Sequence, residues 1–249
     1  MKRLALTLIL ILSTISVWSG NIDDLFDSVH KRDKKGFLNL LQKAEDVNIR
    51  NSHGQWLLHS AISSGDPEIC KAILDKGANV NAQNARGLTA LHWISLNNDT
   101  EDASKVQIVV DLIEKGADVN LRDYSSQTPL HWATTHNQTE IVKALIDKGA
   151  DIHARESFEG NTALHIAADK GYISIMKLLM KHGASVSLKN KWGKSPFDLI
   201  RKAHKAKVFP KKKQLSQNDK GEKPKAESTD NQAPQKIDNP VDNKEKAKQ

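Results

Sequence analysis

Four histidines are the side chains of this sequence that could most readily bind a metal. They are His59, His92, His131 and His165, and each of them follows a leucine. A shared zinc ion would need ligand atoms about 2 Å from the metal. The histidines recur once in each copy of a repeated segment, and neighbouring layers of a stacked fold lie roughly 10 Å apart. We therefore expect a ladder of structural histidines rather than a metal site.

The single cysteine, Cys70, excludes an internal disulfide. It aligns with Val109, Val142 and Met176 in an apolar helical stripe, which predicts a buried core residue. A reactive cysteine needs a base and exposure, and neither is indicated. The sequence holds no zinc-protease helix motif, serine-hydrolase elbow or phosphate-binding loop. We therefore expect no enzyme activity and no cofactor.

These residues belong to a segment that occurs four times. The copies begin at Gly54 ("GQWLLHSAISSGDPEICKAILDKGANVNA"), Gly87 ("GLTALHWISLNN"), Ser126 ("SQTPLHWATTHNQTEIVKALIDKGADIHA") and Gly160 ("GNTALHIAADKGYISIMKLLMKHGASVSL"). A partial fifth copy, "GKSPFDLIRKA", begins at Gly193. The steps between the copies are 33, 39, 34 and 33 residues. A regular period of this length predicts a stacked repeat protein.

Each copy predicts two helices. Thr128 can cap the first helix, and Pro129 fits its first turn, where no N–H is needed. Trp56 takes the capping place in the first full copy, which predicts a weaker helix start there. Gly149 follows the second helix, where a left-handed residue is favoured. The second helix carries the apolar stripe of a buried face: Ile141, Val142, Leu145 and Ile146.

The segment resembles the ankyrin repeat. The resemblance rests on the period of 33 and on the signature T-P-L-H-x-A at Thr128–Ala133, followed by G-A-D-V-N-like residues at Gly149–Ile152. It covers roughly residues 21–203. It implies an all-α repeat solenoid, an ankyrin stack of helix–turn–helix units with β-hairpin-like loops. It also implies that the histidines bond backbone and hydroxyl groups that link repeats, and that hairpin tips and inner helices face a concave groove for protein partners.

A stack of repeats needs polar caps at its ends. We assign residues 21–52 to an N-terminal capping repeat and 192–207 to a C-terminal cap, with Asp198 in the place of the repeat histidine. The ankyrin repeats between them are 53–85, 86–124, 125–158 and 159–191. The 86–124 repeat carries a six-residue insertion near 97–104, between its helices, which is either a second contact or slack. One extra residue near Phe158 lengthens the next step.

Positions at the hairpin tips vary between copies and gather cations and aromatics toward the C-terminal end. Arginine and aromatic residues are frequent anchors of interfaces, although isolated exposed aromatics are also common. The candidate partner-binding residues are Arg86, Arg122, Tyr124, Arg155, Phe158, Lys191, Trp192 and His136.

The first 20 residues, "MKRLALTLILILSTISVWSG", join two cations to an apolar run of signal-peptide length. We expect cleavage after Ser19 or Gly20 and export to a bacterial periplasm or the extracellular space (a secreted protein). An uncleaved N-terminal anchor is the alternative. No transmembrane span is expected after cleavage.

The net charge of +7 is unevenly distributed along the chain. Residues 21–200 carry 21 Lys/Arg and 23 Asp/Glu, whereas residues 201–249 carry 14 and 7. Residues 208–249 are poor in apolar side chains and are expected to be a disordered basic and polyampholyte tail.

Two functions follow. The first is an exported, non-catalytic module that presents a concave groove to a protein. The alternative is a surface-tethering protein whose basic run, 201–213, binds anionic lipid, cell-wall polymer or nucleic acid. Salt weakens a polycationic contact more than an aromatic one.

Overall fold

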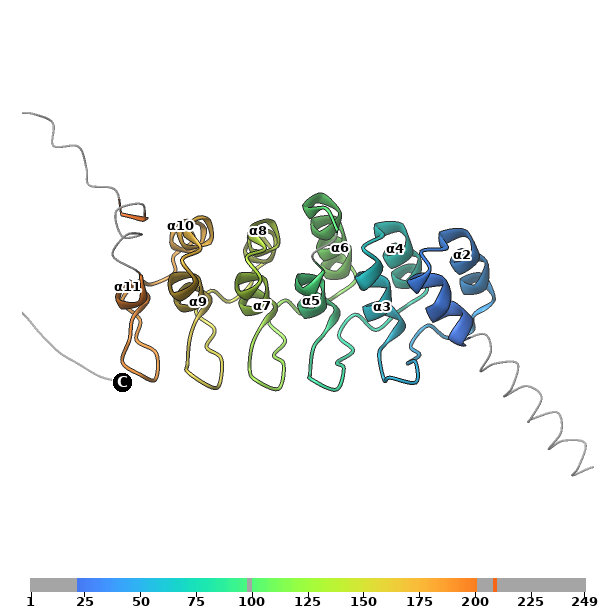
Figure 1. Ribbon diagram of the computed structural model, residues 1–249, viewed down its shortest axis with the longest axis horizontal. Helices are drawn as coiled ribbons and strands as arrows, with labels where there is room; N and C mark the ends of the chain where they lie inside the picture. The colour runs from blue at the N-terminus through green and yellow to red at the C-terminus, as the bar shows by residue number, and fades with distance from the viewer. Residues whose placement is uncertain (1–21, 98–99, 201–207, 210–249) are drawn as a thin grey trace, which may run out of the picture. The chain divides into compact units, whose positions relative to one another are not determined.

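The computed structural model describes residues 22–97, 100–200 and 208–209. These residues lie in one unit of the chain, in which pairs of helices and projecting hairpins repeat in a row (Figure 1). The described residues contain no strand, only an isolated bridge between Arg50 and Trp56. The fold is an all-α repeat solenoid, as the sequence predicts. The leader, most of the basic run and the tail from residue 210 onward lie outside the described residues.

The helices form two layers. Residues 22–30 are helical and precede α2 (Lys34–Lys43). The inner layer, from which the hairpins project, holds α3 (Leu57–Ser64), α5 (Ala90–Trp93) with the 3₁₀ turn η1 (Ile94–Leu96), α7 (Pro129–Thr135), α9 (Ala163–Lys170) and α11 (Pro196–Leu199). The outer layer holds α4 (Pro67–Asp75), α6 (Asp102–Glu114), α8 (Thr139–Asp147) and α10 (Ile173–Lys181).

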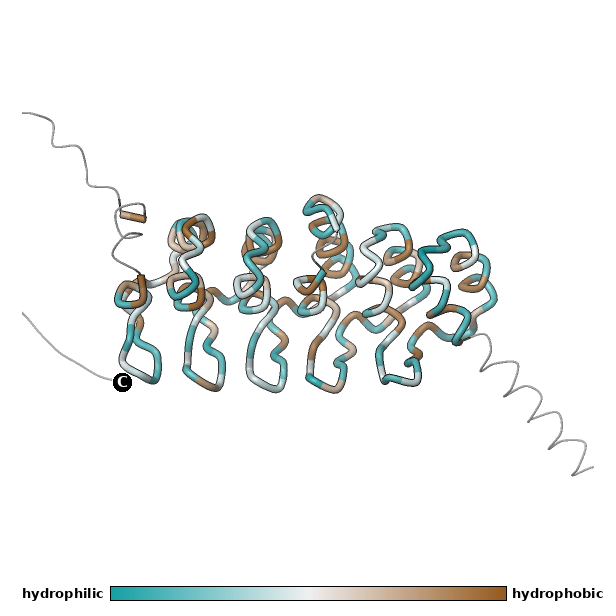
Figure 2. The backbone as a smooth tube through the Cα atoms, in the orientation of Figure 1, coloured by the Kyte–Doolittle hydropathy of each residue, from teal (hydrophilic) through white to brown (hydrophobic). Residues whose placement is uncertain are grey.

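Apolar residues are concentrated in the helices, whereas the hairpins mix polar and apolar residues (Figure 2). Cys70 is completely buried in this core together with Val109, Val142 and Met176. The prediction of a core cysteine is therefore confirmed. Burial raises the pKa of the Cys70 thiol far above its usual value, because the thiolate is poorly solvated there.

The histidine ladder joins successive repeats. Nδ1 of His131 accepts a hydrogen bond from the backbone N–H of Thr128 (3.2 Å) and lies 2.9 Å from its Oγ1. The remaining ring proton is therefore on Nε2, which donates to the carbonyl oxygen of Asn161 in the next hairpin (3.2 Å). His92 and His165 repeat this arrangement with their own threonines and with the following hairpins. The structural role that the resemblance implied for these histidines is confirmed.

Two positions depart from the ladder in ways that the sequence indicates. Trp56 gives α3 no side-chain cap; its Nε1–H donates to the Gln83 carbonyl oxygen instead (2.9 Å), and Arg50 lies 3.9 Å from its ring centroid. In α11 Asp198 replaces the histidine and accepts from both the backbone N–H (2.9 Å) and the hydroxyl (2.7 Å) of Ser195. The carboxylate therefore completes the local cap at the start of α11.

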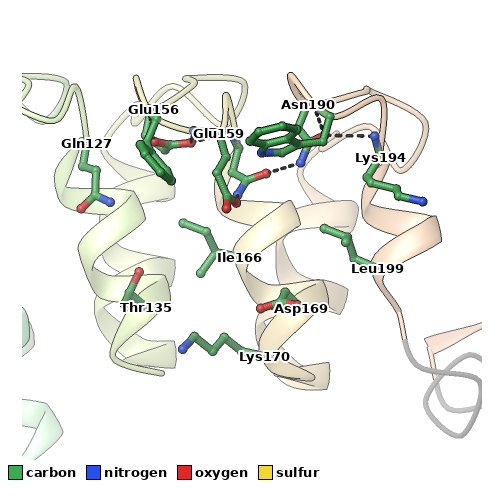
Figure 3. Close-up of a pocket in the computed structure, with 13 residues that line it drawn as sticks. Gln127, Thr135, Glu156, Glu159, Ile166, Asp169, Lys170, Asn190, Lys194 and Leu199 are labelled. Atoms are coloured by element: carbon green, nitrogen blue, oxygen red, sulfur yellow. Dashed lines mark hydrogen bonds between the residues drawn. The ribbon is translucent and has the colours of Figure 1, made fainter.

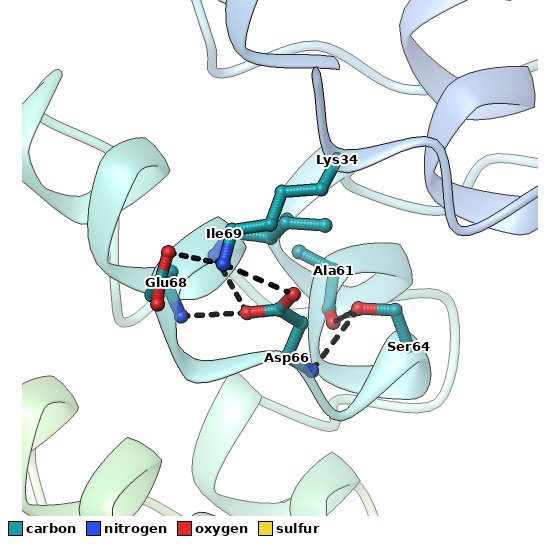
Figure 4. Close-up of polar contacts among 6 residues, drawn as sticks. All are labelled: Lys34, Ala61, Ser64, Asp66, Glu68 and Ile69. Atoms are coloured by element: carbon teal, nitrogen blue, oxygen red, sulfur yellow. Dashed lines mark hydrogen bonds and ion pairs between the residues drawn. The ribbon is translucent and has the colours of Figure 1, made fainter. Parts of the chain in front are cut away.

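The N-terminal helix pair is joined to the first full repeat by packing and by charge. Asp66 caps α4 by accepting from the backbone N–H of Glu68 (2.8 Å) and of Ile69 (3.3 Å). Lys34, at the start of α2, approaches the carboxylates of both Asp66 and Glu68 (Figure 4). Such exposed ion pairs contribute little, so buried apolar side chains such as Phe37 supply most of the attachment.

The insertion in the second full repeat is packed against both neighbouring repeats. It lengthens α6 to 13 residues, compared with 9 in α8. The Asn97 side-chain amide donates to the carbonyl oxygens of Ile62 (2.9 Å) and Ser63 (3.3 Å) at the end of α3. On the other side, the buried Lys105 ammonium donates to Oε1 of Gln138, just before α8 (3.0 Å). The residues at the two ends of the insertion, Asn97 and Lys105, therefore bond the preceding and the following repeat.

No helix within the described residues is long and apolar enough to cross a membrane.

Candidate binding groove

Three exposed aromatic rings occupy successive hairpin tips at the C-terminal end of the described stack. Tyr124 is 74% exposed, Phe158 is 79% exposed and Trp192 is 68% exposed. Apolar rings of this size are favourable to bury and are frequent anchors of interfaces. Their use in binding depends on how firmly the hairpins hold them.

One polar side chain organises each hairpin from within. Asn190 accepts hydrogen bonds from the backbone N–H groups of Trp192 and Lys194, both at 3.0 Å. In the preceding hairpin Glu156 takes this role and accepts from Phe158 (2.6 Å), Glu159 (2.8 Å) and Asn161 (2.8 Å).

The glutamate accommodates the extra residue of its hairpin. Asn84 reaches the N–H of Leu88, four residues on, whereas Glu156 reaches Asn161, five residues on. The longer side chain therefore spans the longer loop that carries Phe158. Burial acts to raise the pKa of Glu156, but the three backbone N–H groups outweigh it and hold this pKa below its ordinary value.

Neighbouring hairpins are also bonded to one another. The backbone N–H of Lys191 donates to the carbonyl oxygen of Glu159 (2.8 Å), and that of Ser157 donates to Ser125 (3.0 Å). The Lys191 ammonium donates in addition to the carbonyl oxygen of Ser157. The tips therefore present their rings from a continuous hydrogen-bonded frame.

A groove of about 510 Å³ lies beneath the last two of these hairpins (Figure 3). Phe158 and Trp192 line it. Figure 3 shows Ile166 and Leu199 projecting into it from α9 and α11, while Glu156, Glu159, Asn190 and Lys194 border it on the hairpin side. Thr135, Asp169 and Lys170 border it at the helix ends, and Gln127 and Asn161 complete the lining.

The charges that remain for a ligand in this groove are balanced. The Glu156 carboxylate is already engaged by three backbone N–H groups. The other charged lining residues are two carboxylates, Glu159 and Asp169, and two ammonium groups, Lys170 and Lys194. The groove therefore combines aromatic and aliphatic surface with polar groups and little net charge.

Of the eight candidate partner-binding residues, the structure brings two into the groove lining, Phe158 and Trp192. Tyr124 is exposed on the neighbouring tip but does not line this groove. Arg122 donates from Nη1 to the carbonyl oxygens of Ser126 (3.0 Å) and Arg155 (2.7 Å), which ties two hairpins together. Arg122 is thus engaged within the frame.

The other predicted residues lie outside the groove lining as well. Arg155 donates from Nη1 to the carbonyl oxygen of Gly160 (3.1 Å), inside its own hairpin. Arg86 lies 5.5 Å from the Trp132 ring centroid, and His136 stacks on the same tryptophan at 5.5 Å. Lys191 is exposed but bonds the adjacent hairpin through its ammonium group.

Sequence reasoning missed the floor of the groove. Ile166 and Leu199 both follow the ladder position, since Ile166 follows His165 and Leu199 follows Asp198. The same position holds Ser60, Trp93 and Trp132 in the other repeats. This difference in side-chain size was a signal that could have located the groove.

The described residues offer little else in the way of site chemistry. They contain no group of three or more His, Cys, Asp or Glu side chains placed to hold a metal ion. Burial lowers the pKa of each ladder histidine, because the protonated ring would lose its solvation. The neutral rings are therefore engaged in linking repeats.

Comparison with known proteins agrees with this architecture. A family model described as ankyrin repeats (3 copies) matches residues 25–123 and 101–190. The B-cell lymphoma 3 protein homolog of Mus musculus is 28% identical over 153 residues, 60% of this chain and 33% of the mouse protein. The nuclear factor NF-kappa-B p105 subunit of Gallus gallus is 29% identical over 143 residues, 55% of this chain and 14% of the chicken protein.

A shorter match is closer in sequence. The ankyrin repeat and KH domain-containing protein mask of Drosophila melanogaster is 48% identical over 58 residues, 23% of this chain and 1% of the fly protein. The chain spans about a third of the mouse relative's length and less of the other two. The family match covers the residues in which threonine–histidine caps, paired helices and bonded hairpins recur, and the chain belongs to the ankyrin-repeat family.

Proposed function

We propose that the protein is a non-catalytic binding module that holds a protein partner in the groove between α7 and α11. The observation that carries this proposal is the pair of exposed rings, Phe158 and Trp192, on bonded hairpins above an apolar floor. Contiguous exposed apolar surface, unlike a single exposed ring, marks interaction sites, and aromatic residues are frequent anchors of interfaces.

The hydrogen-bonded frame lowers the cost of association. Ordering a mobile loop or side chain on binding costs roughly 0.5–1.5 kcal/mol for each immobilised side chain. Here Glu156 and Asn190 already fix the backbone beneath both rings. More of the interaction energy therefore remains as affinity.

We also propose that the protein acts after export, in a bacterial periplasm or outside the cell. The support is the composition of residues 1–20, two cations followed by an apolar run. Mass spectrometry of protein recovered outside the cytoplasm tests this proposal. It predicts an N-terminus at Gly20 or Asn21, and full-length protein found only in the cytoplasm would contradict it.

Tethering to an anionic surface through residues 201–213 is the second candidate, supported by seven Lys/Arg and no acidic residue in that run. Ionic strength separates the two functions. Raising the salt from about 0.05 M to about 0.5 M shortens the Debye length severalfold, which would release a polycationic contact but leave an aromatic groove contact in place.

The groove proposal is tested by comparative capture from cells of the organism that encodes the protein. The full chain, a Phe158→Ala/Trp192→Ala variant and a Tyr124→Ala variant serve as bait, and bound proteins are quantified by mass spectrometry. The proposal predicts a partner that the double variant loses and the Tyr124→Ala variant keeps. Equal recovery on all three baits would place the interface elsewhere.

A further inference from the structure

Within the described residues, side chains occupy the inner face of the stack in its middle repeats, and a groove lies near its C-terminal end. Trp93, on α5, donates its Nε1–H to the Ser63 hydroxyl on α3 (2.8 Å) and packs edge-on against His59 at 5.6 Å. Asn97 bonds the carbonyl groups at the end of α3. This tryptophan and the insertion therefore cover the inner face between the first two full repeats.

The next layer is filled in a similar way. Trp132, on α7, is buried, and its Nε1–H donates to the Asp123 carboxylate in the hairpin above (2.9 Å). Arg86 and His136 lie against its ring. At the equivalent positions of the following layers stand the smaller Ile166 and Leu199, and the 510 Å³ groove lies beside them. The groove therefore lies where Ile166 and Leu199 replace the two tryptophans; in the first full repeat this position holds Ser60, which is buried.

The open stretch is short. It runs from α7 to α11, which is two helix spacings of about 8–10 Å each, or about 16–20 Å. An extended chain advances about 3.3 Å per residue, so the groove accommodates about five or six residues. Its volume also falls within the range of roughly 300–1,000 Å³ that is typical of pockets for small ligands. A groove of this size fits a peptide segment better than the face of a folded domain.

The lining indicates the chemistry of that segment. Phe158 and Trp192 above, with Ile166 and Leu199 below, enclose space for a large apolar side chain. The lining holds three carboxylates, Glu156, Glu159 and Asp169, and two ammonium groups, Lys170 and Lys194, so its formal charge of −1 gives little charge selection. We infer that the groove takes a short extended peptide of about six residues, anchored by one large apolar side chain between the rings of Phe158 and Trp192. This inference rests on the proposed function and specifies the partner.

The test uses the full chain and a library of random twelve-residue peptides displayed on phage. We expect enriched peptides to share one large apolar residue, to retain binding when shortened to about six residues, and to change little in affinity between about 0.05 M and about 0.5 M salt. Phe158→Ala and Trp192→Ala should each raise Kd at least about tenfold. Tyr124→Ala is the matched control, an exposed tip aromatic outside the groove, and should change Kd less than about twofold.

A second variant tests the groove by filling it. Ile166→Trp places at this position the residue that Trp93 and Trp132 supply in the preceding repeats, and it should abolish peptide binding while far-UV circular dichroism and the unfolding midpoint stay close to the parent values. Failure to enrich any peptide, or binding that is insensitive to Phe158, Trp192 and Ile166, would overturn the inference. A folded partner that depends on Trp192, with no binding by peptides, would overturn the peptide inference and leave the groove proposal standing.

Discussion

Acid should weaken the stack through His59, the first histidine of the ladder. Its Nε2–H donates to the Leu88 carbonyl oxygen (2.9 Å), and the side chain is almost fully buried. Within the described residues no hydrogen-bond partner lies within reach of its buried Nδ1, because Trp56 stands where the other repeats have a capping threonine. A proton added at Nδ1 would therefore be buried without an acceptor.

The size and sign of the effect follow from the pKa. Burial lowers the pKa of His59 from 6.5 to about 4; the bond to Leu88 opposes this, and the charges of His92 and Arg50 add to it. The unfolded chain thus takes up a proton at a higher pH than the folded chain. The stability that depends on neutral His59 is fully present above pH 6.5 and is lost as the pH falls toward 4. A gap of about 2.5 units corresponds to about 3 kcal/mol.

Urea unfolding at several pH values between about 7 and about 4, followed by circular dichroism, measures this loss. His59→Gln should cost about 1 kcal/mol at neutral pH through the lost hydrogen bond. Between neutral pH and pH 4, the free energy of unfolding of the variant should then fall by about 3 kcal/mol less than that of the parent. His182→Gln, at an exposed histidine after α10, is the control and should follow the parent. Parallel pH curves for the parent and His59→Gln would refute the reasoning.

Three further substitutions probe the frame that holds the site. Ser126 has a φ of +58° at a position where the other hairpins have glycine. Because glycine adopts this backbone conformation more easily, Ser126→Gly should raise the free energy of unfolding by about 0.5–1 kcal/mol. The control Ser125→Gly should not raise it. Glu156→Ala removes the acceptor of three backbone N–H groups and should lower the free energy of unfolding by about 1–3 kcal/mol. Amide exchange should become faster in the hairpin that contains Glu156 and stay unchanged in the first hairpin. Asn97→Ala should cost about 1 kcal/mol in urea unfolding, because the carbonyl groups of Ile62 and Ser63 each lose the Asn97 donor. No loss would mean that Asn97 does not support the stack.

The fold could be predicted because its determinants are local and recur. Thr128, His131 and Gly149 each act within one repeat or on the next one, so a single copy of the segment contains the information for cap, ladder and turn. The sequence also indicated the two exceptions. Trp56 gives a helix without a side-chain cap, and Asp198 completes a cap in place of histidine.

The site could be predicted only in part. The aromatic tips were recognisable by residue type, and Tyr124, Phe158 and Trp192 are all exposed. Residue type did not indicate that Arg122 and Arg155 are engaged with carbonyl groups of the hairpins. The Arg122 contact with the Arg155 carbonyl joins two hairpins 33 residues apart, and a pattern within one repeat does not contain it. The Arg155 contact with Gly160 lies within one hairpin and depends on how that loop folds.

The position of the groove depended on a comparison between repeats. The residue after the ladder position is large in Trp93 and Trp132, smaller in Ile166 and Leu199, and smallest in Ser60, which is buried. Packing shows why the tryptophans matter, since they are bonded to Ser63 and to Asp123 of neighbouring elements. Residue size at this position therefore indicates the groove only together with the contacts between layers.

The central claim, that binding is confined to the groove between α7 and α11, is tested most directly by hydrogen–deuterium exchange of the full chain with and without its tightest selected peptide. The account predicts slower exchange at the backbone amides of residues 158–161 and 192–194, with no change in the first hairpin, residues 51–55. Slowed exchange in the first hairpin or in the outer helices, with residues 158–161 and 192–194 unaffected, would contradict it.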